Sequence, residues 1–168
     1  QIGDLIAVSG NIGDAALALR ILQKQLSFQV NDKFLDNYYL PNPQLNLIDG
    51  LASYANSGMD ISDGLLADLQ HILDSSDKSA VIELDKIPLS ATTRAILAKY
   101  PAEINNILNG GDDYKLLFTA NAANMAKLQQ KHAIYVIGKI EAASSDKIKI
   151  FDADHNLVKF TIAGFEHF

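Results

Sequence analysis

The sequence predicts an α/β sandwich built on a mixed β-sheet. Apolar segments with the spacing of strands alternate loosely with segments that have the spacing of helices. Near the end of the chain, two short strand-like segments flank a polar turn at residues 152–156, a pattern typical of a hairpin. Because a terminal hairpin does not fit an all-parallel sheet, we expect a mixed sheet with helices over at least one face.

The chain up to residue 61 predicts a strand, a glycine-containing turn, three helices and a second strand. After the turn, leucines recur at the spacing of one helix face. Pro41 and Pro43 stop the second helix, because proline cannot continue one. In order, these elements are the strand at 5–8, the turn at 9–14, the helices at 15–26, 34–39 and 45–55, and the strand at 58–61.

The rest of the chain alternates more regularly. Its first helix is marked by apolar residues at clear helical spacing between Leu65 and Leu73. Pro101 separates the next two helices. In order, the elements are the helix at 65–73, the strand at 80–84, the helices at 90–99 and 102–108, the strand at 114–119, the helix at 122–132, the strand at 134–140, and the hairpin strands at 148–151 and 157–162.

Composition excludes several classes of protein. A chain of 168 residues that is 48% hydrophobic fits one domain with a real core. The absence of cysteine excludes disulfides and thiolate metal sites, and it suits a cytoplasmic protein. No apolar run approaches the roughly 18 residues that span a bilayer, so we expect no membrane partner. With a net charge of −6 and no clustered basic face, we expect no nucleic-acid partner either.

Polar side chains gather where the predicted strand at 58–61 meets the helix at 65–73. Residues i and i+2 of a strand point to the same side, so Asp60 and Ser62 are expected to project together, with Asp63 at the first turn of the helix. Unpaired N–H groups there attract anions, and a neighbouring carboxylate can hold magnesium that bridges phosphate oxygens. The alternative is helix capping by Ser62 or Asp63, and the two can coexist.

Two further segments contain paired or spaced glycines. The run Gly-Gly-Asp-Asp-Tyr at 110–114 permits close backbone approach and places two acids before a strand, although a simple turn at the end of a helix has the same composition. The run at 9–14 lacks both the G-x-G-x-x-G pattern and the Walker lysine, so we interpret it as a structural turn. The four histidines show no ligand spacing, which argues against zinc.

Taken together, these segments resemble thiamine-monophosphate kinase. The resemblance rests on four motifs that occur in the family's order: residues 3–16, with their two glycine–aspartate pairs, the Asp-Ile-Ser-Asp-Gly-Leu run at 60–65, the run at 110–114, and the ending Gly-Phe-Glu-His-Phe at 164–168. It covers the C-terminal half of that enzyme, and the chain also lacks a starting methionine. We therefore expect residues 1–168 to form a single C-terminal domain that is inactive alone.

The resemblance implies a fold and a set of partners. The kinase belongs to the superfamily of aminoimidazole ribonucleotide synthetase, whose C-terminal domain is a three-layer α/β/α sandwich. An N-terminal domain of that family holds most magnesium ligands and forms the homodimer. The implied reaction transfers the γ-phosphoryl group of ATP to thiamine monophosphate, giving thiamine diphosphate, and such transfer depends mainly on positioning and charge neutralisation.

The resemblance also implies roles for particular residues. Asp60 and Asp63 would be Mg²⁺ ligands and Ser62 would contact ATP. Asp112 and Phe165 would contact the thiamine substrate, where an aromatic face suits the cationic thiazolium ring.

The sequence departs from the family pattern at three places. Asp112 stands where the family usually has glutamate, Lys115 replaces a common acid, and residues 40–44 lack flanking arginines. Two alternatives therefore remain: a superfamily enzyme with a different acceptor, and a non-catalytic binding module.

Overall fold

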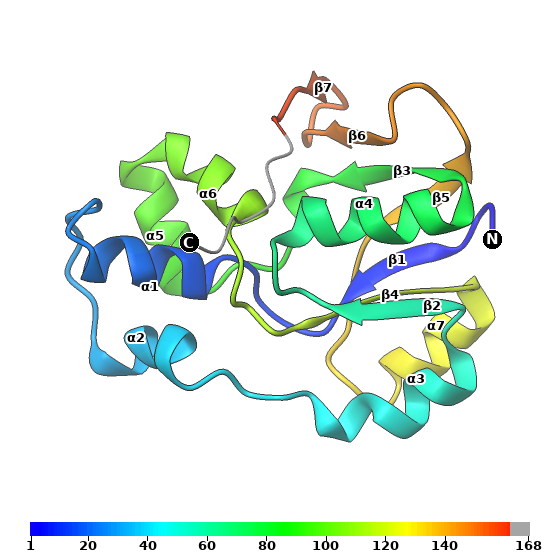
Figure 1. The fold of residues 1–168 in the computed structure, drawn as a ribbon, viewed down its shortest axis with the longest axis horizontal. Coiled ribbons are helices and arrows are strands. Elements are labelled where there is room, and N and C mark those ends of the chain that lie inside the picture. Colours follow the sequence, from blue (N-terminus) through cyan, green and yellow to red (C-terminus); the bar gives the residue numbers. More distant parts are fainter. Residues whose placement is uncertain (162–168) are drawn as a thin grey trace.

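The computed structural model describes residues 1–161, which form a seven-stranded sheet with helices on both faces (Figure 1). The strands are β1 (Leu5–Val8), β2 (Ser57–Asp60), β3 (Lys78–Glu83), β4 (Leu116–Ala120), β5 (Tyr135–Ala142), β6 (Ile148–Phe151) and β7 (Leu157–Val158). Their order across the sheet is β2-β4-β1-β5-β3-β6-β7. Only β3 and β6 pair in parallel among the described strands, which confirms the predicted mixed sheet.

Seven α-helices are described in the part of the chain up to residue 161. They are α1 (Asp14–Leu22), α2 (Asp32–Tyr39), α3 (Ile48–Tyr54), α4 (Leu65–Ser76), α5 (Ala91–Lys99), α6 (Ile104–Asn109) and α7 (Ala122–Gln129). Short 3-10 turns precede α3 at Leu45–Leu47 and α6 at Pro101–Glu103. None of these helices is long and apolar enough to cross a membrane.

Two separate hydrophobic clusters show that the fold has three layers. Ile6 and Val8 of β1 are fully buried in the larger cluster, together with apolar residues of α1, α4 and α6. Ala7, which points to the opposite face of the same strand, lies in a smaller cluster with Met125 and Leu128 of α7. Helices α3 and α7 lie side by side on that second face, away from α4 (Figure 1). The expected α/β/α sandwich is confirmed.

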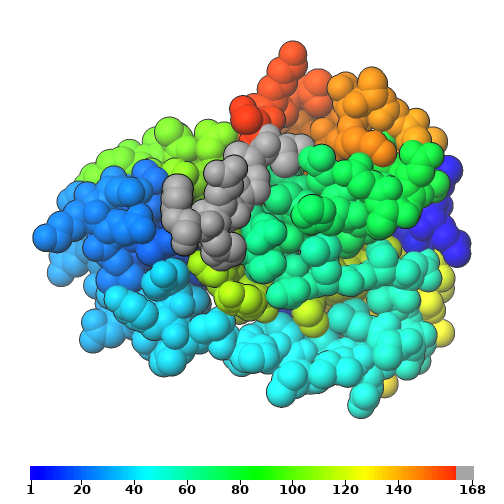
Figure 2. Space-filling view, viewed as in Figure 1, coloured from blue at the N-terminus to red at the C-terminus, as the bar shows by residue number. Residues whose placement is uncertain are grey.

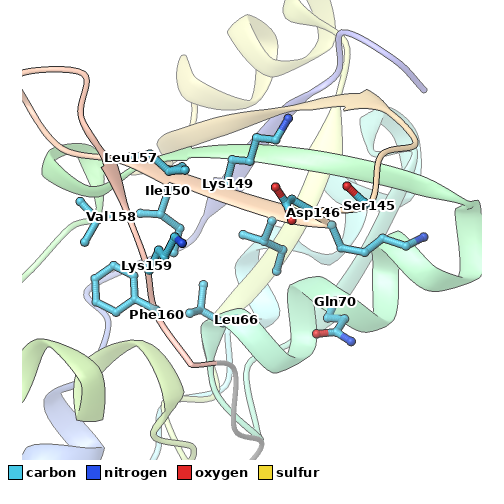
Figure 3. A pocket seen from close by; sticks show the side chains of 12 residues that line it. Leu66, Gln70, Ser145, Asp146, Lys149, Ile150, Leu157, Val158, Lys159 and Phe160 are labelled. Carbon is cyan, nitrogen blue, oxygen red and sulfur yellow. The ribbon is translucent and has the colours of Figure 1, made fainter.

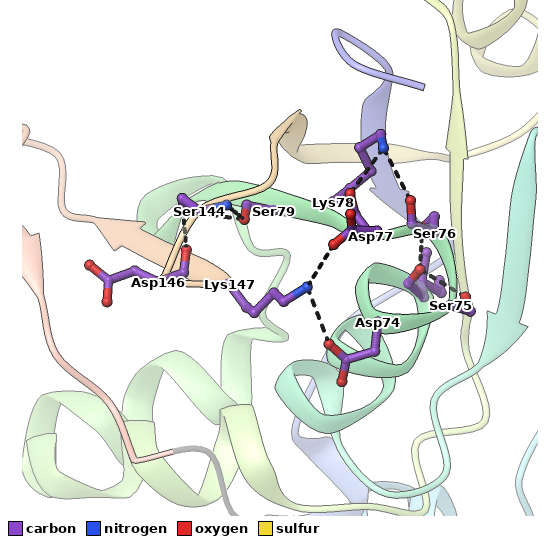
Figure 4. A network of polar contacts seen from close by, with 10 residues as sticks. Asp74, Ser75, Ser76, Asp77, Lys78, Ser79, Ser144, Asp146 and Lys147 are labelled. Carbon is purple, nitrogen blue, oxygen red and sulfur yellow. Dashed lines mark hydrogen bonds and ion pairs between the residues drawn. The ribbon is translucent and has the colours of Figure 1, made fainter.

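Polar contacts also stabilise the region around the parallel strands β3 and β6. The ammonium group of Lys147, just before β6, lies 3.6 Å from a carboxylate oxygen of Asp74 in α4 and 3.7 Å from one of Asp77 (Figure 4). The hydroxyl of Ser79 in β3 accepts a hydrogen bond from the backbone N–H of Ser144 at 2.9 Å. These exposed ion pairs each contribute at most about 1 kcal/mol, so the sheet depends chiefly on its buried faces.

Several predicted boundaries shift where the backbone turns left-handed. The helix predicted over 15–26 ends at Leu22, because Lys24 adopts a φ of 59°. The strand predicted over 114–119 begins at Leu116, after Tyr114 at a φ of 47°. The hairpin is confirmed, but its second strand has only two described residues, 157–158.

Candidate functional site

Three segments of the sequence meet at one end of the sheet because their strands pair antiparallel. Asp60, the last residue of β2, lies opposite Leu116, the first residue of β4. Val8, the last residue of β1, lies opposite Leu117. The loops that follow β2 and β1 therefore lie beside the segment that precedes β4. This places the motifs at 60–65, 9–14 and 110–114 together.

Backbone hydrogen bonds join the loop after β2 to the segment before β4. The N–H of Ile61 donates to the carbonyl of Lys115 at 2.7 Å, and the carbonyl of Ile61 accepts from the N–H of Tyr114 at 2.8 Å. The carbonyl of Ser62 accepts from the N–H of Asp112 at 3.0 Å. Residues 61–62 are thus fixed by a segment some fifty residues later in the chain.

Glycines allow this contact. A Cβ atom on Gly111 would lie 2.1 Å from the carbonyl oxygen of Ser62, closer than atoms can approach. Gly64 has a φ of 115°, a value that other residues rarely adopt, and its Cβ would meet the backbone of Asn109 at 2.6 Å. Glycine is therefore needed at these two positions because other backbone segments pack closely against them. The alternative of a simple turn at the end of a helix does not require this contact.

The start of α4 differs from the capping alternative. Gly64 occupies the N-cap position, and neither Ser62 nor Asp63 caps the helix through its side chain. Instead, Oδ2 of Asp68, inside the helix, accepts the N–H groups of Ser62 at 3.0 Å, Asp63 at 3.1 Å and Gly64 at 3.2 Å. The predicted capping by Ser62 or Asp63 is therefore wrong, and neither side chain is used to cap α4.

Carboxylates gather at this end of the sheet. The ligand atoms of Asp63, Asp68 and His71 all lie within 4.8 Å of one another, so the fold brings one histidine, which is exposed, close to two carboxylates. Burial raises the pKa of Asp68, and the charge of Asp63 raises it further against the opposing effect of the backbone N–H groups. Carboxylate oxygens are the ligands that a hard divalent cation prefers, so the carboxylate of Asp63 fits magnesium, whereas the imidazole of His71 does not.

Tyr114 shows that Asp112 belongs to the same neighbourhood. Its hydroxyl donates to Oδ1 of Asp112 at 3.3 Å. The negative charge of Asp112 raises the pKa of Tyr114 most, and burial, Asp60 and Asp63 add to the rise. Asp60 and Tyr114 are exposed, while Asp63 and Asp112 are half-buried. The structure therefore brings together four of the five predicted site residues. The fifth, Phe165, lies outside the described residues.

The third motif is joined to the second through Asp113. This buried carboxylate accepts the N–H of Gly13 at 2.7 Å and of Ala15 at 3.4 Å, at the start of α1. The hydroxyl of Ser9 accepts the N–H of Leu116 at 2.9 Å. These contacts agree with the interpretation of residues 9–14 as a structural turn.

Three cavities border these elements. One of about 310 Å³ lies between the start of α1 and the segment after α2, and Asp113 and Lys115 line it with Lys33 and Pro41. Another, of about 550 Å³, lies between α4 and the β6–β7 hairpin and is lined by apolar residues and lysines (Figure 3). In the space-filling view this hairpin, in orange and red, lies above α4, in green (Figure 2). None of residues 60–64 lines either of these cavities, but Asp60 lines a third, of about 480 Å³, together with Met59 of β2 and Leu116 of β4.

Asp113 gives a prediction about pH. Burial raises the pKa of its carboxyl from 3.8 to about 7, although the two N–H groups of α1 lower it. Between these pH values the folded chain holds a proton that the unfolded chain has lost. The stability that this raised pKa of Asp113 contributes is therefore fully present below pH 3.8. It falls as the pH rises from 3.8 to about 7, by up to about 1.4 kcal/mol per pH unit.

Asp113→Asn should flatten this dependence, because the amide oxygen still accepts the N–H of Gly13 but does not titrate. Urea denaturation at several pH values in that interval measures the free energy of unfolding. The same pH dependence in both proteins would contradict the assignment.

Comparisons with known proteins agree with the geometry. Residues 1–151 match the family model described as AIR synthase related protein, C-terminal domain. The chain is 38% identical over 178 residues to the thiamine-monophosphate kinase of Haemophilus influenzae, covering 100% of this chain and 53% of the relative. It is 33% identical to that of Buchnera aphidicola (subsp. Acyrthosiphon pisum), covering 100% and 54%. The chain therefore spans about half the length of the curated relatives it matches.

Solved structures show the same fold. Thiamine-monophosphate kinase from Stenotrophomonas maltophilia K279a superposes with a TM-score of 0.76 at 34% identity, over 88% of this chain and 50% of that one. The structure of AaThiL complexed with AMPPCP and TMP gives a TM-score of 0.81 at 29% identity, over 100% and 52%. Escherichia coli HypE, at 15% identity and a TM-score of 0.79, shares the fold.

Proposed function

The chain belongs to the family of AIR synthase related proteins, whose C-terminal domain it matches over residues 1–151, and from this we propose that it is the C-terminal half of a thiamine-monophosphate kinase. The whole protein would transfer the γ-phosphoryl group of ATP to thiamine monophosphate. The observation that carries the proposal is the meeting of the 60–65 loop with the 110–114 segment, which gathers Asp60, Asp63 and Asp112 at one end of the sheet.

In this proposal Asp60 and Asp63 hold Mg²⁺, which neutralises the charge of the nucleotide phosphates when bound. The exposed and half-buried carboxylates of these residues are acceptors only, which suits a hard cation and repels a bare phosphate. Ser62 contacts ATP through its hydroxyl, because its backbone N–H and carbonyl already bond Asp68 and Asp112.

Asp112 and Phe165 contact the thiamine substrate. The carboxylate of Asp112 suits a cationic ring, and its hydrogen bond from Tyr114 restrains its orientation. The side chain of Asp112 is one methylene shorter than that of glutamate, so its carboxylate lies closer to the backbone. Asp112 has a left-handed backbone conformation, with a φ of 67°, and this conformation determines the direction in which its side chain leaves the backbone.

The rest of the site is assigned to the N-terminal domain that the resemblance implies. The described end of the sheet is acidic, so phosphates need additional cations or basic groups from elsewhere. The homodimer and the cytoplasmic location belong to the same proposal, and the mass of the full-length protein in solution tests the first.

The test is turnover by the full-length protein with ATP, Mg²⁺ and thiamine monophosphate. We expect thiamine diphosphate and ADP in equal amounts, measured by chromatography, and no product when a chelator removes Mg²⁺. Residues 1–168 alone should bind ATP weakly and give no product. Turnover only with a different acceptor would contradict the proposed substrate, and micromolar ATP affinity of residues 1–168 would contradict the need for the N-terminal domain.

A further inference from the structure

Asp68 is a buried carboxylate with an unusual set of partners. It is the fourth residue of α4, only 1% of its surface is exposed, and its neighbours in the helix are apolar. Burying a carboxylate is costly unless hydrogen bonds compensate for the lost water. Here three consecutive backbone N–H groups, those of Ser62, Asp63 and Gly64, converge on Oδ2 at 3.0–3.2 Å. Charge-assisted bonds of this kind are among the stronger hydrogen bonds in proteins.

The opposite side of the same loop is bonded elsewhere. The carbonyls of Ile61 and Ser62 accept the N–H groups of Tyr114 and Asp112. The loop therefore has three of its N–H groups directed to Asp68, while the N–H of Ile61 and two of its carbonyls bond the segment before β4. Its conformation is fixed from outside by both partners, because it contains no regular helix or strand of its own between residues 61 and 64.

We propose that Asp68 is a positioning residue for the phosphoryl-transfer site: its buried carboxylate gathers the N–H groups of Ser62, Asp63 and Gly64 and thereby holds Asp60 and Asp63 in the geometry that binds a divalent cation. This inference rests on the proposed function. Groups that orient metal ligands without touching the metal typically contribute 10–100-fold to metal affinity or activity. Such groups order the loop before the cation binds, so that binding does not have to order a flexible loop.

The charge of Asp68 has a second effect. Because ligand atoms of Asp63, Asp68 and His71 lie within 4.8 Å, the two carboxylates repel each other until a cation neutralises them. Oδ2 already accepts three hydrogen bonds, so Asp68 acts through the loop and through its charge. Two substitutions separate these effects: Asp68→Asn retains an acceptor oxygen and removes the charge, while Asp68→Ala removes both.

Asp74 offers a matched control on the same helix. Its carboxylate is about half exposed and is paired with Lys147 at 3.6 Å (Figure 4). Asp74→Ala removes the same charge from α4 without touching the loop. We expect it to leave cation affinity within about twofold of wild type, since an exposed ion pair contributes at most about 1 kcal/mol.

The experiment uses the full-length protein and three measurements. Calorimetry with Mn²⁺ reports cation affinity, hydrogen exchange reports the order of residues 62–64, and steady-state kinetics report the Mg²⁺ requirement and the KM for thiamine monophosphate. In Asp68→Ala we expect Mn²⁺ affinity to fall about 10–100-fold and the three amides to exchange faster. The Mg²⁺ concentration for half-maximal rate should rise by a similar factor, with KM nearly unchanged. Asp68→Asn should lose less Mn²⁺ affinity than Asp68→Ala. Its amides at residues 62–64 should exchange more slowly than those of Asp68→Ala.

Wild-type Mn²⁺ affinity and unchanged amide exchange in a folded Asp68→Ala protein would overturn the inference. If Asp68→Asn loses as much affinity as Asp68→Ala while exchange stays slow, Asp68 is a direct ligand, and the positioning role is again refuted. Should Asp68→Ala fail to fold, Asp68→Asn still decides: positioning predicts that it loses less than about 10-fold in Mn²⁺ affinity, and a larger loss while amide exchange stays slow contradicts positioning. Calorimetry and exchange need no thiamine monophosphate, so their outcome is separate from that of the kinase assay.

Discussion

Replacing Asp60 and Asp63 together by asparagine in the full-length protein is expected to reduce phosphoryl transfer at least about 100-fold, or roughly 2.7 kcal/mol of transition-state stabilisation. Both carboxylates lie beside the loop that Asp68 and the 112–114 segment hold in place. Asparagine retains the size of each side chain but removes the charge that binds a hard cation. The rate at saturating ATP, measured across a range of Mg²⁺ concentrations, is the readout.

Asp154→Asn provides the control for this double substitution. Asp154 is exposed in the turn between β6 and β7, so the same chemical change there should leave the rate near wild type. If Asp60→Asn with Asp63→Asn also leaves the rate near wild type, the metal assignment is wrong. The alternative of a non-catalytic binding module would then stand.

Replacing Gly111 by alanine is expected to lower the free energy of unfolding of this chain by about 3 kcal/mol, the upper part of the usual cost of overpacking. The added Cβ would lie 2.1 Å from the carbonyl oxygen of Ser62, a backbone atom. That carbonyl cannot retreat easily, because it accepts a hydrogen bond from Asp112 and its own residue donates one to Asp68. Urea denaturation measures the change.

Gly10→Ala is the matched control, since neither glycine has a positive φ. The nearest atoms to a Cβ on Gly10 are side-chain carbons of Lys115 at 3.1 and 3.2 Å. A long lysine side chain can move aside, so we expect a loss below about 1 kcal/mol. Equal losses at the two positions would show that the contact between Gly111 and Ser62 does not determine the cost.

Much of the fold could be predicted from local patterns. The apolar spacing between Leu65 and Leu73 predicted α4, and the alternation ending in a polar turn predicted the hairpin and the mixed sheet. Boundaries were less predictable. Lys24 and Tyr114 have left-handed backbone conformations that nothing in their residue types requires, and these conformations depend on what packs around them.

The candidate site was predictable in part. Acids beside glycines at 60–64 and 110–114 are visible in the sequence, and the structure brings them together. Asp68 was missed, although an aspartate within the apolar run of a helix is a signal that could have indicated a buried partner. Apolar spacing describes which face of a helix is buried, but it cannot identify the groups that a buried carboxylate accepts.

The sequence by itself determined which residues could perform the chemistry and which segments form strands and helices, because residue type and periodicity are local properties. Only the tertiary structure decided that three motifs form one site. That outcome depends on β4 pairing antiparallel with both β1 and β2, so that the ends of β1 and β2 lie beside the start of β4. It also decided that Asp68, rather than Ser62 or Asp63, holds the start of α4, because three N–H groups converge on a carboxylate four to six residues later in the chain.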